Sequence, residues 1–479
     1  MKKAAAALVT VTARIVQDDT GSTLELPVVL TNVGPLDALL RYQVLFHEKS
    51  RTWHLKLCQA VRLLLEYSEA NGGVFERPKD LFQSFSVRLL SGTVGADGLD
   101  PSGLYWLPRR AANARKLIGQ LTELSQWLAR EYDVPTLAPL RDATSHEQVL
   151  AAAAWAYRNN ASFLGHAESR ARAVEALRRT PHVPKPKLPN LLHDEVVRFP
   201  ANRFGDLLFK GFVGRERAPG ELPRINLRDV LVTLMMHGAG VRLSECFHLW
   251  FGDVQEHPLD PTIAWVRIGH PTHGLTKWTV DGADVEGTRA EFLATRGLTP
   301  RHLLMGKKHA GWKNPALDGK WYLELHWSEP DYGRLFLRLW RLYLRRVVRL
   351  DRRHPYAWVT FGGRSPGDPC TIAEFKKAHE RAVRRIGLVP SRTNGTRPHG
   401  HRHDYGQRLV DAGVSPRVVR KCLHHASLTS QLVYTQPDRD RMTKELEAAH
   451  ARMAAGAKLD FAQLQQKYLN DVGLLEGSA

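Results

Sequence analysis

A basic, proline-rich segment divides this chain and limits what it can fold into. The segment RRTPHVPKPKLPN covers residues 179–191. Its prolines cannot continue a helix or sit in a central strand, and it holds little apolar surface to bury. It is therefore typical of a linker, which we place at residues 181–191. With 479 residues in total, the chain is long enough for a folded domain on each side.

The part before the linker is predicted to be mostly helical. Apolar residues alternate on both sides of the turn-forming sequence QDDTGST, which indicates a hairpin and gives an N-terminal extension at residues 1–35. In SRTWHLKLCQAVRLLLEYSEANGG, Ser50 is a candidate N-cap before apolar residues at helical spacing, and a glycine pair ends the pattern. Two further segments of this kind complete a helical domain at residues 36–180.

The part after the linker combines helices with two candidate strands. The segments TIAWVRIGH and KWYLELHW are rich in β-branched and aromatic residues, and they are separated by a long polar stretch. Helical patterns fill most of the remainder, including the basic helix GRLFLRLWRLYLRRVVRL. We expect a mixed domain at residues 192–445 and a helical tail at 446–479. The predicted fold class is mainly α with a small β component (α+β).

The charge of the chain points to a polyanionic partner. The formal net charge is +19 and the isoelectric point is about 9.9, which favours nucleic acid. An anionic membrane surface is the alternative, but the sequence shows no basic amphipathic anchor and no apolar stretch long enough to cross a bilayer. Four scattered cysteines without CxxC spacing argue against a disulfide framework or zinc finger and favour a reducing, cytoplasmic setting.

The segment from Arg397 to Pro437 concentrates groups that carry chemistry: five histidines, five arginines and two tyrosines. His399 and Arg402 fall at the start of a helix that ends at a glycine, and His425 follows the end of the next helix. Tyr434 lies on a third short helix. Three short helices with tight turns can bring these side chains together.

This set of side chains suits transesterification at a DNA phosphate. A tyrosine hydroxyl can form a covalent phosphoester, and a histidine can take or share its proton. Guanidinium groups match the charge that builds on the phosphate oxygens. A second arginine is available at Arg242 in HGAGVRLSECFHLWFGDV, with Glu245 one helical turn further on to orient it.

Metal binding is the alternative use of the histidines. Positions 399, 401 and 403 alternate, and 424 and 425 adjoin, but the flanking pattern is helical. Apart from Asp404, no cluster of carboxylates or cysteines with ligand spacing accompanies them. We therefore expect no metal and no cofactor. Supporting or packing roles are expected for the remaining side chains: His237, His248, Cys246, His401, His403, His424 and Tyr405.

The combination of motifs resembles the catalytic core of tyrosine recombinases of the phage integrase type. The matching elements are His-Gly-His-Arg, LVDAG, LHHAS and VYTQP, together with an arginine box at GAGVRLSECFHLWFGDV, and they span roughly residues 195–440. The resemblance implies that Arg242 and Arg402 bind the phosphate, that His399 and His425 assist, and that Tyr434 is the nucleophile. The stretches DPSGLYW, KKHAGWKNP and HGHRH are most similar to the gamma-mobile-trio recombinases.

The sequence departs from that family at two positions. His424 stands where the family usually has a glycine, at a position that tends to be left-handed, and histidine tolerates this better than most residues. The family also uses a lysine on a β-hairpin as general acid. We favour Lys313 in HAGWKNP, with Lys308 next, because both shortly precede the second strand. Other lysines in this stretch are Lys277, Lys307 and Lys320.

The resemblance implies a site-specific recombinase or integrase of a mobile element that works through a 3′-phosphotyrosine, without metal or ATP. Its partners would be double-stranded DNA, on which it would form a homo-tetramer, and possible accessory proteins of the same element. It would act in the bacterial cytoplasm, at the nucleoid. An apolar tail face at Phe461, Leu464 and Tyr468 would dock on a neighbouring protomer. Three alternatives stay open: a DNA-binding regulator without strand exchange, a metal-dependent nuclease, and a related topoisomerase or telomere resolvase.

Overall fold

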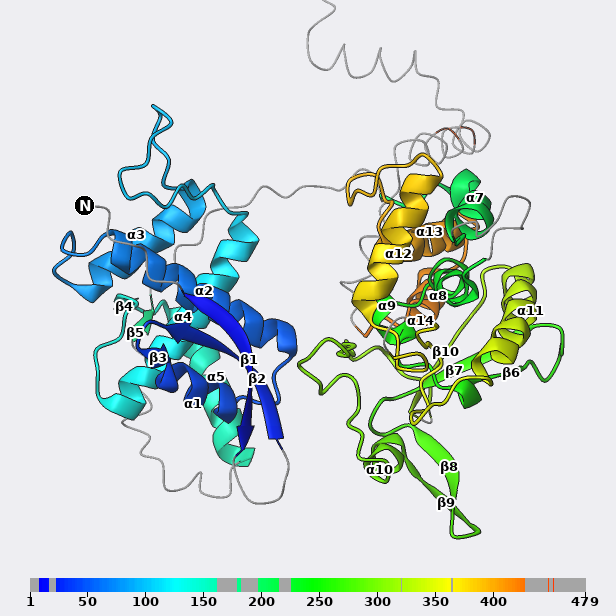
Figure 1. Cartoon of the computed structure of the whole chain (residues 1–479). Helices are drawn as coiled ribbons and strands as arrows, with labels where there is room; N and C mark the ends of the chain where they lie inside the picture. The colour runs from blue at the N-terminus through cyan, green and yellow to red at the C-terminus, as the bar shows by residue number, and fades with distance from the viewer. Residues whose placement is uncertain are drawn as a thin grey trace, which may run out of the picture. The chain divides into compact units, whose positions relative to one another are not determined.

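The computed structural model places two compact units, Met1–Asn190 and Leu191–Ala479, so the division falls at the end of the proline-rich segment (Figure 1). The structure describes residues 8–16, 23–161, 179–181, 197–214, 225–319, 321–362 and 365–426, together with the single residues 447 and 451. Each unit is described by itself.

The described residues of the first unit form two small sheets and five helices. Its elements are β1 (Val9–Val16), β2 (Thr23–Thr31), β3 (Gly34–Pro35), α1 (Asp37–Leu45), α2 (Arg51–Ala70), α3 (Pro78–Ser91), α4 (Ala111–Tyr132), β4 (Leu140–Asp142), α5 (Ser145–Ala161) and β5 (Arg179–Pro181). Helix α2 begins where predicted, because the side chain of Ser50 accepts a hydrogen bond from the backbone N–H of Trp53.

The predicted hairpin is present and is packed into the helical unit. Strands β1 and β2 pair antiparallel, from Val9 opposite Leu30 to Val16 opposite Thr23. Val29 is fully buried in the same core as Leu57 of α2. The predicted N-terminal extension therefore also packs against the core of the helical unit.

The strand pair β4–β5 was not predicted. It joins Leu140 to Pro181 and Asp142 to Arg179. Pro181, the first residue of the predicted linker, belongs to this pair. Strands of three residues carry too little periodicity to be recognised in the sequence.

The second unit surrounds a central helix with a three-stranded sheet and further helices. Its elements are η2 (Ala201–Arg203), α7 (Phe204–Asp206), the π-helical turn η3 (Leu207–Gly211), α8 (Leu227–Gly238), α9 (Leu243–Cys246), η4 (Phe251–Asp253), β6 (Val254–Glu256), β7 (Ala264–Gly269), β8 (Leu275–Val280), β9 (Ala283–Thr288), α10 (Arg289–Ala294), β10 (Tyr322–Glu324), α11 (Pro330–Val347), α12 (Ile372–Arg385), α13 (Pro398–Asp411) and α14 (Pro416–Cys422).

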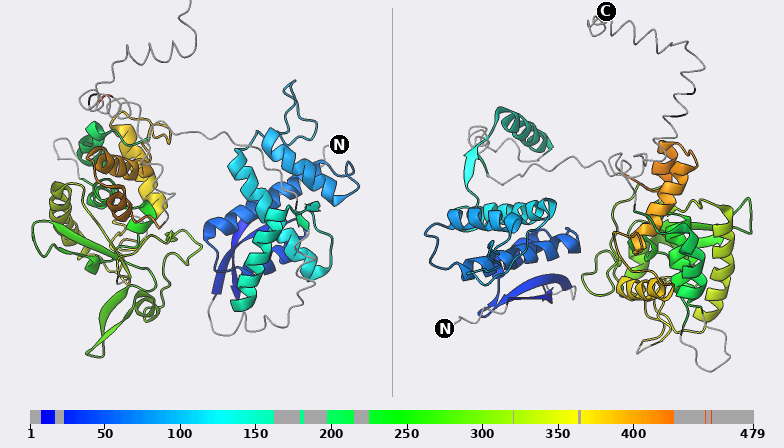
Figure 2. Two further views of the ribbon diagram at one scale, coloured as in Figure 1. Left: turned by 180° about the vertical axis from the view of Figure 1, so that it is seen from behind. Right: turned by 90° about the horizontal axis from the view of Figure 1, so that it is seen from above.

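The two predicted strands of this unit are direct neighbours. Strands β7 and β10 pair antiparallel, with Gly269 opposite Tyr322 and Arg267 opposite Glu324. The chain between them forms a second hairpin, β8–β9, which extends away from the helices (Figure 2). Asp281 and Gly282 at its tip both have positive φ. An Asp-Gly pair is a strong hairpin signal that the sequence analysis passed over.

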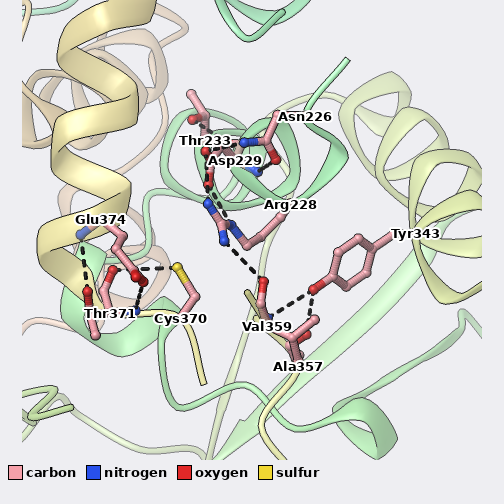
Figure 3. Close-up of polar contacts among 10 residues, drawn as sticks. All are labelled: Asn226, Arg228, Asp229, Thr233, Tyr343, Ala357, Val359, Cys370, Thr371 and Glu374. Atoms are coloured by element: carbon pink, nitrogen blue, oxygen red, sulfur yellow. Dashed lines mark hydrogen bonds and ion pairs between the residues drawn. The ribbon is translucent and has the colours of Figure 1, made fainter. Parts of the chain in front are cut away.

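Polar contacts join helices α8 and α11 to the chain at residues 357–359, and a separate set lies at the start of α12 (Figure 3). At the start of α8, Arg228 binds the carboxylate of Asp229 at 2.8 Å and the carbonyl of Val359 at 3.0 Å. From α11, the Tyr343 hydroxyl donates to the carbonyl of Ala357 and accepts from the N–H of Val359. Helix α12 begins beside them, capped by Thr371.

The observed architecture confirms the predicted fold class, since helices dominate and the sheets are small. The hydrophobic core of the second unit collects buried residues from α8, β7, α11 and α12. Within the described ranges, no helix has both the length and the apolar character that crossing a bilayer requires.

Candidate active site

Arg402 joins the motif segments at the centre of the second unit. It lies in the first turns of α13 and is 1% exposed. Its Nη1 donates to the carbonyl of Gly240 and its Nη2 to the carbonyl of Leu423, both at 2.5 Å. One arginine therefore connects the loop before Arg242 with the turn that leads into His425.

Two glycines near these contacts leave no room for a side chain. Gly240 has a φ of +66°, and a Cβ there would lie 2.3 Å from the ring of Tyr405. A Cβ on Gly400 would lie 1.7 Å from the carbonyl oxygen of Gly395. Tyr405 is fully buried, as predicted, and donates its hydroxyl to the carbonyl of His326 at 2.8 Å.

Arg242 is held at the N-terminus of the short helix α9. Its Nη1 lies 2.7 Å from Oε1 of Glu245, and its backbone N–H donates to Oε2 of the same carboxylate at 3.1 Å. Glu245 is fully buried, whereas the Arg242 side chain is 20% exposed. The ion pair expected from the sequence is present and leaves part of the guanidinium accessible.

His399 and His425 share one electrostatic environment with the two arginines. Burial lowers the pKa of His425 to about 3, and the charges of Arg402 and Arg242 add to this effect. The pKa of His399 is also lowered, first by packing of its ring and then by His403, Arg402, Lys313 and Arg242. His399 is exposed to solvent. Both rings are therefore neutral near pH 7, and each keeps one ring nitrogen with a lone pair.

Lys313 lies close enough for its charge to act on His399. The loop that carries it is anchored on both sides. Trp312 packs edge-on against the buried ring of His248 at 5.3 Å, and the N–H of Ala316 donates to the carbonyl of His424 at 3.2 Å. The Lys313 side chain itself is exposed.

Among the other lysines, Lys307 is exposed, two form ion pairs and one is not described. Lys308 forms an exposed ion pair with Asp368 at 3.3 Å, and Lys277 pairs with Glu286 across the β8–β9 hairpin. Lys320 lies outside the described residues. The geometry therefore favours Lys313 over Lys308 as the general acid, which stays a prediction.

Tyr434 lies outside the described residues, as do the tail positions Phe461, Leu464 and Tyr468. The last continuous described range ends at residue 426, one residue beyond His425. His424 has a φ of +51°, the left-handed conformation that was predicted for this position. The six other candidate residues are described, and five of them are brought together.

The alternating histidines of α13 do not converge on one point. His399 and His403 lie side by side, with ring centroids 4.3 Å apart. His401 points into the core, where its Nε2 lies 2.9 Å from Nε2 of His379 and its Nδ1 lies 3.4 Å from Nδ1 of His237. The helical period separates them, as the flanking sequence predicted.

This buried row of histidines makes the second unit sensitive to acid. Burial lowers the pKa of His379 from 6.5 to about 3 and that of His237 to about 2, and it holds the pKa of His401 well below 6.5. The unfolded chain takes up these protons near pH 6.5 while the folded chain does not. Each ring therefore removes about 1.4 kcal/mol of stability per pH unit below its unfolded pKa.

In scanning calorimetry of the full chain, we expect the thermal midpoint for unfolding of the second unit to fall steeply between about pH 7 and pH 5. The stability is fully present above the unfolded histidine pKa and is lost below it. Burial raises the pKa of Asp404, which changes stability with pH in the opposite direction. His379→Phe, between the rings of Phe212 and Phe375, should show a shallower loss. The same slope in this variant would contradict the assignment.

Two large hollows of the second unit lie away from these residues. One of about 930 Å³ is lined by Arg267, Lys277 and Trp321 beside the β8–β9 hairpin, and one of about 760 Å³ by Arg228 and Glu374. Neither is lined by the candidate catalytic residues.

Comparison with known sequences identifies a related segment. Residues 341–441 match the model of the phage integrase family, and this range contains His399, Arg402, His425 and Tyr434. Arg242 and Lys313 lie outside the match. The matched range is a minor part of the 479-residue chain.

The curated relatives are tyrosine recombinases named XerC. The protein of Bacillus licheniformis is 32% identical over 122 residues, which cover 24% of this chain and 37% of the relative. That of Bradyrhizobium diazoefficiens is 31% identical over 86 residues, 18% of this chain and 26% of the relative. The chain thus spans about a third or less of the length of these relatives. The matches support the resemblance seen in the motifs.

Solved structures with similar chains include two DNA complexes. The XerH site-specific recombinase bound to palindromic difH substrate is 13% identical, covers 82% of this chain and 78% of its own, and has a TM-score of 0.44. The Tn1549 transposon integrase in complex with transposon right end DNA is 14% identical, covers 81% and 98%, and has a TM-score of 0.32. Scores at this level do not establish a common overall arrangement.

Proposed function

We propose that this chain is a site-specific tyrosine recombinase that cuts and rejoins DNA through a 3′-phosphotyrosine. One observation carries the proposal. Arg402 ties the loop before Arg242 to the turn before His425, so two guanidinium groups and two neutral histidines occupy one cluster. The family match over residues 341–441 supports the same conclusion.

In the proposed reaction, Tyr434 attacks a scissile phosphate and its proton passes to a neutral histidine, His399 or His425. Arg242 and Arg402 bind the non-bridging oxygens, where negative charge builds in the transition state. Lys313 protonates the leaving 5′ oxygen. The 5′ hydroxyl of a second strand then attacks the phosphotyrosine and reverses the step, so the energy of the bond is conserved.

Trapping the covalent intermediate tests this proposal. The substrate is a nicked duplex made from the DNA that flanks the gene, in which the cleaved 5′ end diffuses away. A recombinase should give an adduct that survives denaturing electrophoresis. A metal-dependent nuclease would release ends without attached protein, and a regulator that has lost strand exchange would bind without cutting. Either of these results would reject the proposal.

The finer assignments are also proposals. The stretches quoted above favour a gamma-mobile-trio recombinase of a bacterial mobile element, acting in the cytoplasm at the nucleoid. The helical unit at residues 36–180 would contact DNA together with the catalytic unit, and four copies would assemble on two sites, with accessory proteins of the same element. The net charge of +19 supports DNA as the partner.

We expect DNA binding to depend strongly on salt. Lysines and arginines that contact phosphates release condensed counterions, so affinity should fall on the order of a hundredfold or more between 50 and 200 mM salt. Fluorescence anisotropy with a labelled duplex of arbitrary sequence measures this. An affinity that hardly changes over that range would contradict a nucleic-acid partner.

Lys313→Ala should slow cleavage of an ordinary phosphodiester on the order of a hundredfold or more, which is typical of a lost general acid. Cleavage of a 5′-phosphorothiolate should be affected much less, because a sulfur leaving group needs no proton. Single-turnover cleavage of the two substrates gives the comparison.

Lys308→Ala is the matched control, since its side chain is paired with Asp368. It should cleave both substrates at close to the wild-type rate. Equal defects of Lys313→Ala on both substrates would remove Lys313 from the role of general acid.

A further inference from the structure

Three side chains from separate segments meet next to the candidate active site. Asp318 follows the Lys313 loop, His326 follows strand β10, and His424 lies in the turn after α14. One ligand atom of each lies within 4.8 Å of the others, and this is a group of potential metal ligands within the described residues. His424 lies far from the other two in the sequence, so residue spacing does not reveal this group.

The hydrogen bonds of His424 leave a ring nitrogen available. Its Nε2 lies 2.8 Å from the carbonyl oxygen of Glu324. A carbonyl oxygen only accepts, so Nε2 carries the proton and Nδ1 carries a lone pair. This Nδ1 is buried without a hydrogen-bond partner in a side chain that is 1% exposed. A carbonyl partner on the opposite ring nitrogen is the usual way in which a metal-binding histidine is oriented.

His326 and Asp318 complete the set. The Nε2 atom of His326 is also buried without a hydrogen-bond partner. Its ring lies nearly parallel to that of His424, with centroids 6.2 Å apart. The carboxylate of Asp318 accepts from the N–H of Glu324 at 3.1 Å and lies 3.9 Å from Nζ of Lys421, so it is not tightly paired. Buried imidazole nitrogens without partners are costly, and a cation would satisfy them.

Two imidazoles and one carboxylate suit a zinc ion. Zinc binds such ligands at about 2.0–2.2 Å in tetrahedral geometry, with their donor atoms roughly 3.5 Å apart. The observed separation needs only a small inward movement to reach this. Three protein ligands leave the fourth position for water.

We propose that Asp318, His326 and His424 form a zinc site that holds the Lys313 loop against the turn carrying His425. Asp318 lies on the Lys313 side, where the N–H of Ala316 already donates to the carbonyl of His424. His424 adjoins His425 in the sequence. The ion positions these segments and takes no part in the chemistry. It also gives the histidine at a left-handed position a purpose that glycine could not serve.

Direct metal binding tests the site without any reference to recombination. Untagged full-length protein is stripped with chelator and titrated with Zn²⁺ alone by calorimetry, and with Co²⁺ as a visible-light probe. We expect one tight equivalent of Zn²⁺, absorption bands of four-coordinate Co²⁺, and a higher thermal midpoint with Zn²⁺. Asp318→Asn keeps the oxygen that accepts from Glu324 and should weaken binding at least tenfold.

His326→Gln should weaken binding to a similar extent, and His257→Gln is the matched control because that residue lies outside the group. All variants are first compared in the absence of metal, where their thermal midpoints should be close to that of the wild type. Absence of a stoichiometric Zn²⁺ site, or equal affinity in all variants, would overturn the proposal. Its effect on cleavage rests on the proposed function, but binding is measured without DNA, so the two can fail independently.

Discussion

Tyr434→Phe should bind DNA almost as tightly as the wild type and form no covalent adduct with it. The substitution removes one hydroxyl and keeps the ring, so most of the packing is retained. Binding depends on basic side chains, which supply a net charge of +19, and one phenol contributes little. The chemistry depends on the hydroxyl, because no other group in the motif can form the phosphotyrosine.

The measurement combines affinity on intact duplex with adduct formation on the nicked substrate, followed by mapping of the labelled peptide. Tyr405→Phe is the matched control, since Tyr405 is buried and its hydroxyl is bonded to the carbonyl of His326. This control should keep forming adduct, with some loss of stability. An adduct that persists in Tyr434→Phe, or that maps to Tyr405, would overturn the assignment of the nucleophile.

Local signals predicted much of the fold. Ser50 caps α2 through its hydroxyl, and Gly413 ends α13 with a φ of +75°. Both features depend on a few neighbouring residues, which is why the sequence reveals them. Ser415 directly precedes α14, but its side chain makes no capping hydrogen bond.

Contacts between distant segments were harder to predict. In the sequence, the β8–β9 hairpin and α10 are inserted between β7 and β10, which pair with each other. The pairing of β7 with β10 does not predict what the inserted segment forms. The choice between Lys313 and Lys308 also depended on three-dimensional position. Both precede β10. Only the structure shows that Lys308 is paired with Asp368, whereas the charge of Lys313 lowers the pKa of His399.

The candidate site shows the same division. The motif spacing identified Arg242, His399, Arg402 and His425 as partners. It did not indicate that Arg402 binds the carbonyls of Gly240 and Leu423, because any residue can supply a carbonyl oxygen. Asp318 and His424 lie far apart in the sequence, so no motif spacing connects them.

These carbonyl contacts give Arg402 a structural role in addition to its proposed role in phosphate binding. A substitution and its matched control can separate the two roles. Arg402→Lys keeps the charge but replaces a rigid, planar fork with one flexible ammonium group. It should slow adduct formation on the order of hundreds-fold, because about 3–4 kcal/mol of transition-state stabilisation is typical for a preorganised donor of this kind. Stability should also fall, since the lysine cannot satisfy both buried carbonyls.

Arg408→Lys on the same helix is the control that distinguishes these two effects. Arg408 binds Asp404 at 2.8 Å and the carbonyl of His237, so its replacement also removes structural hydrogen bonds. It is not a candidate for phosphate binding. Both variants should lower the thermal midpoint, but only Arg402→Lys should lower the single-turnover rate on the nicked substrate at a temperature where both are folded. Equal rates in the two variants would mean that Arg402 acts only as a structural link between the motifs.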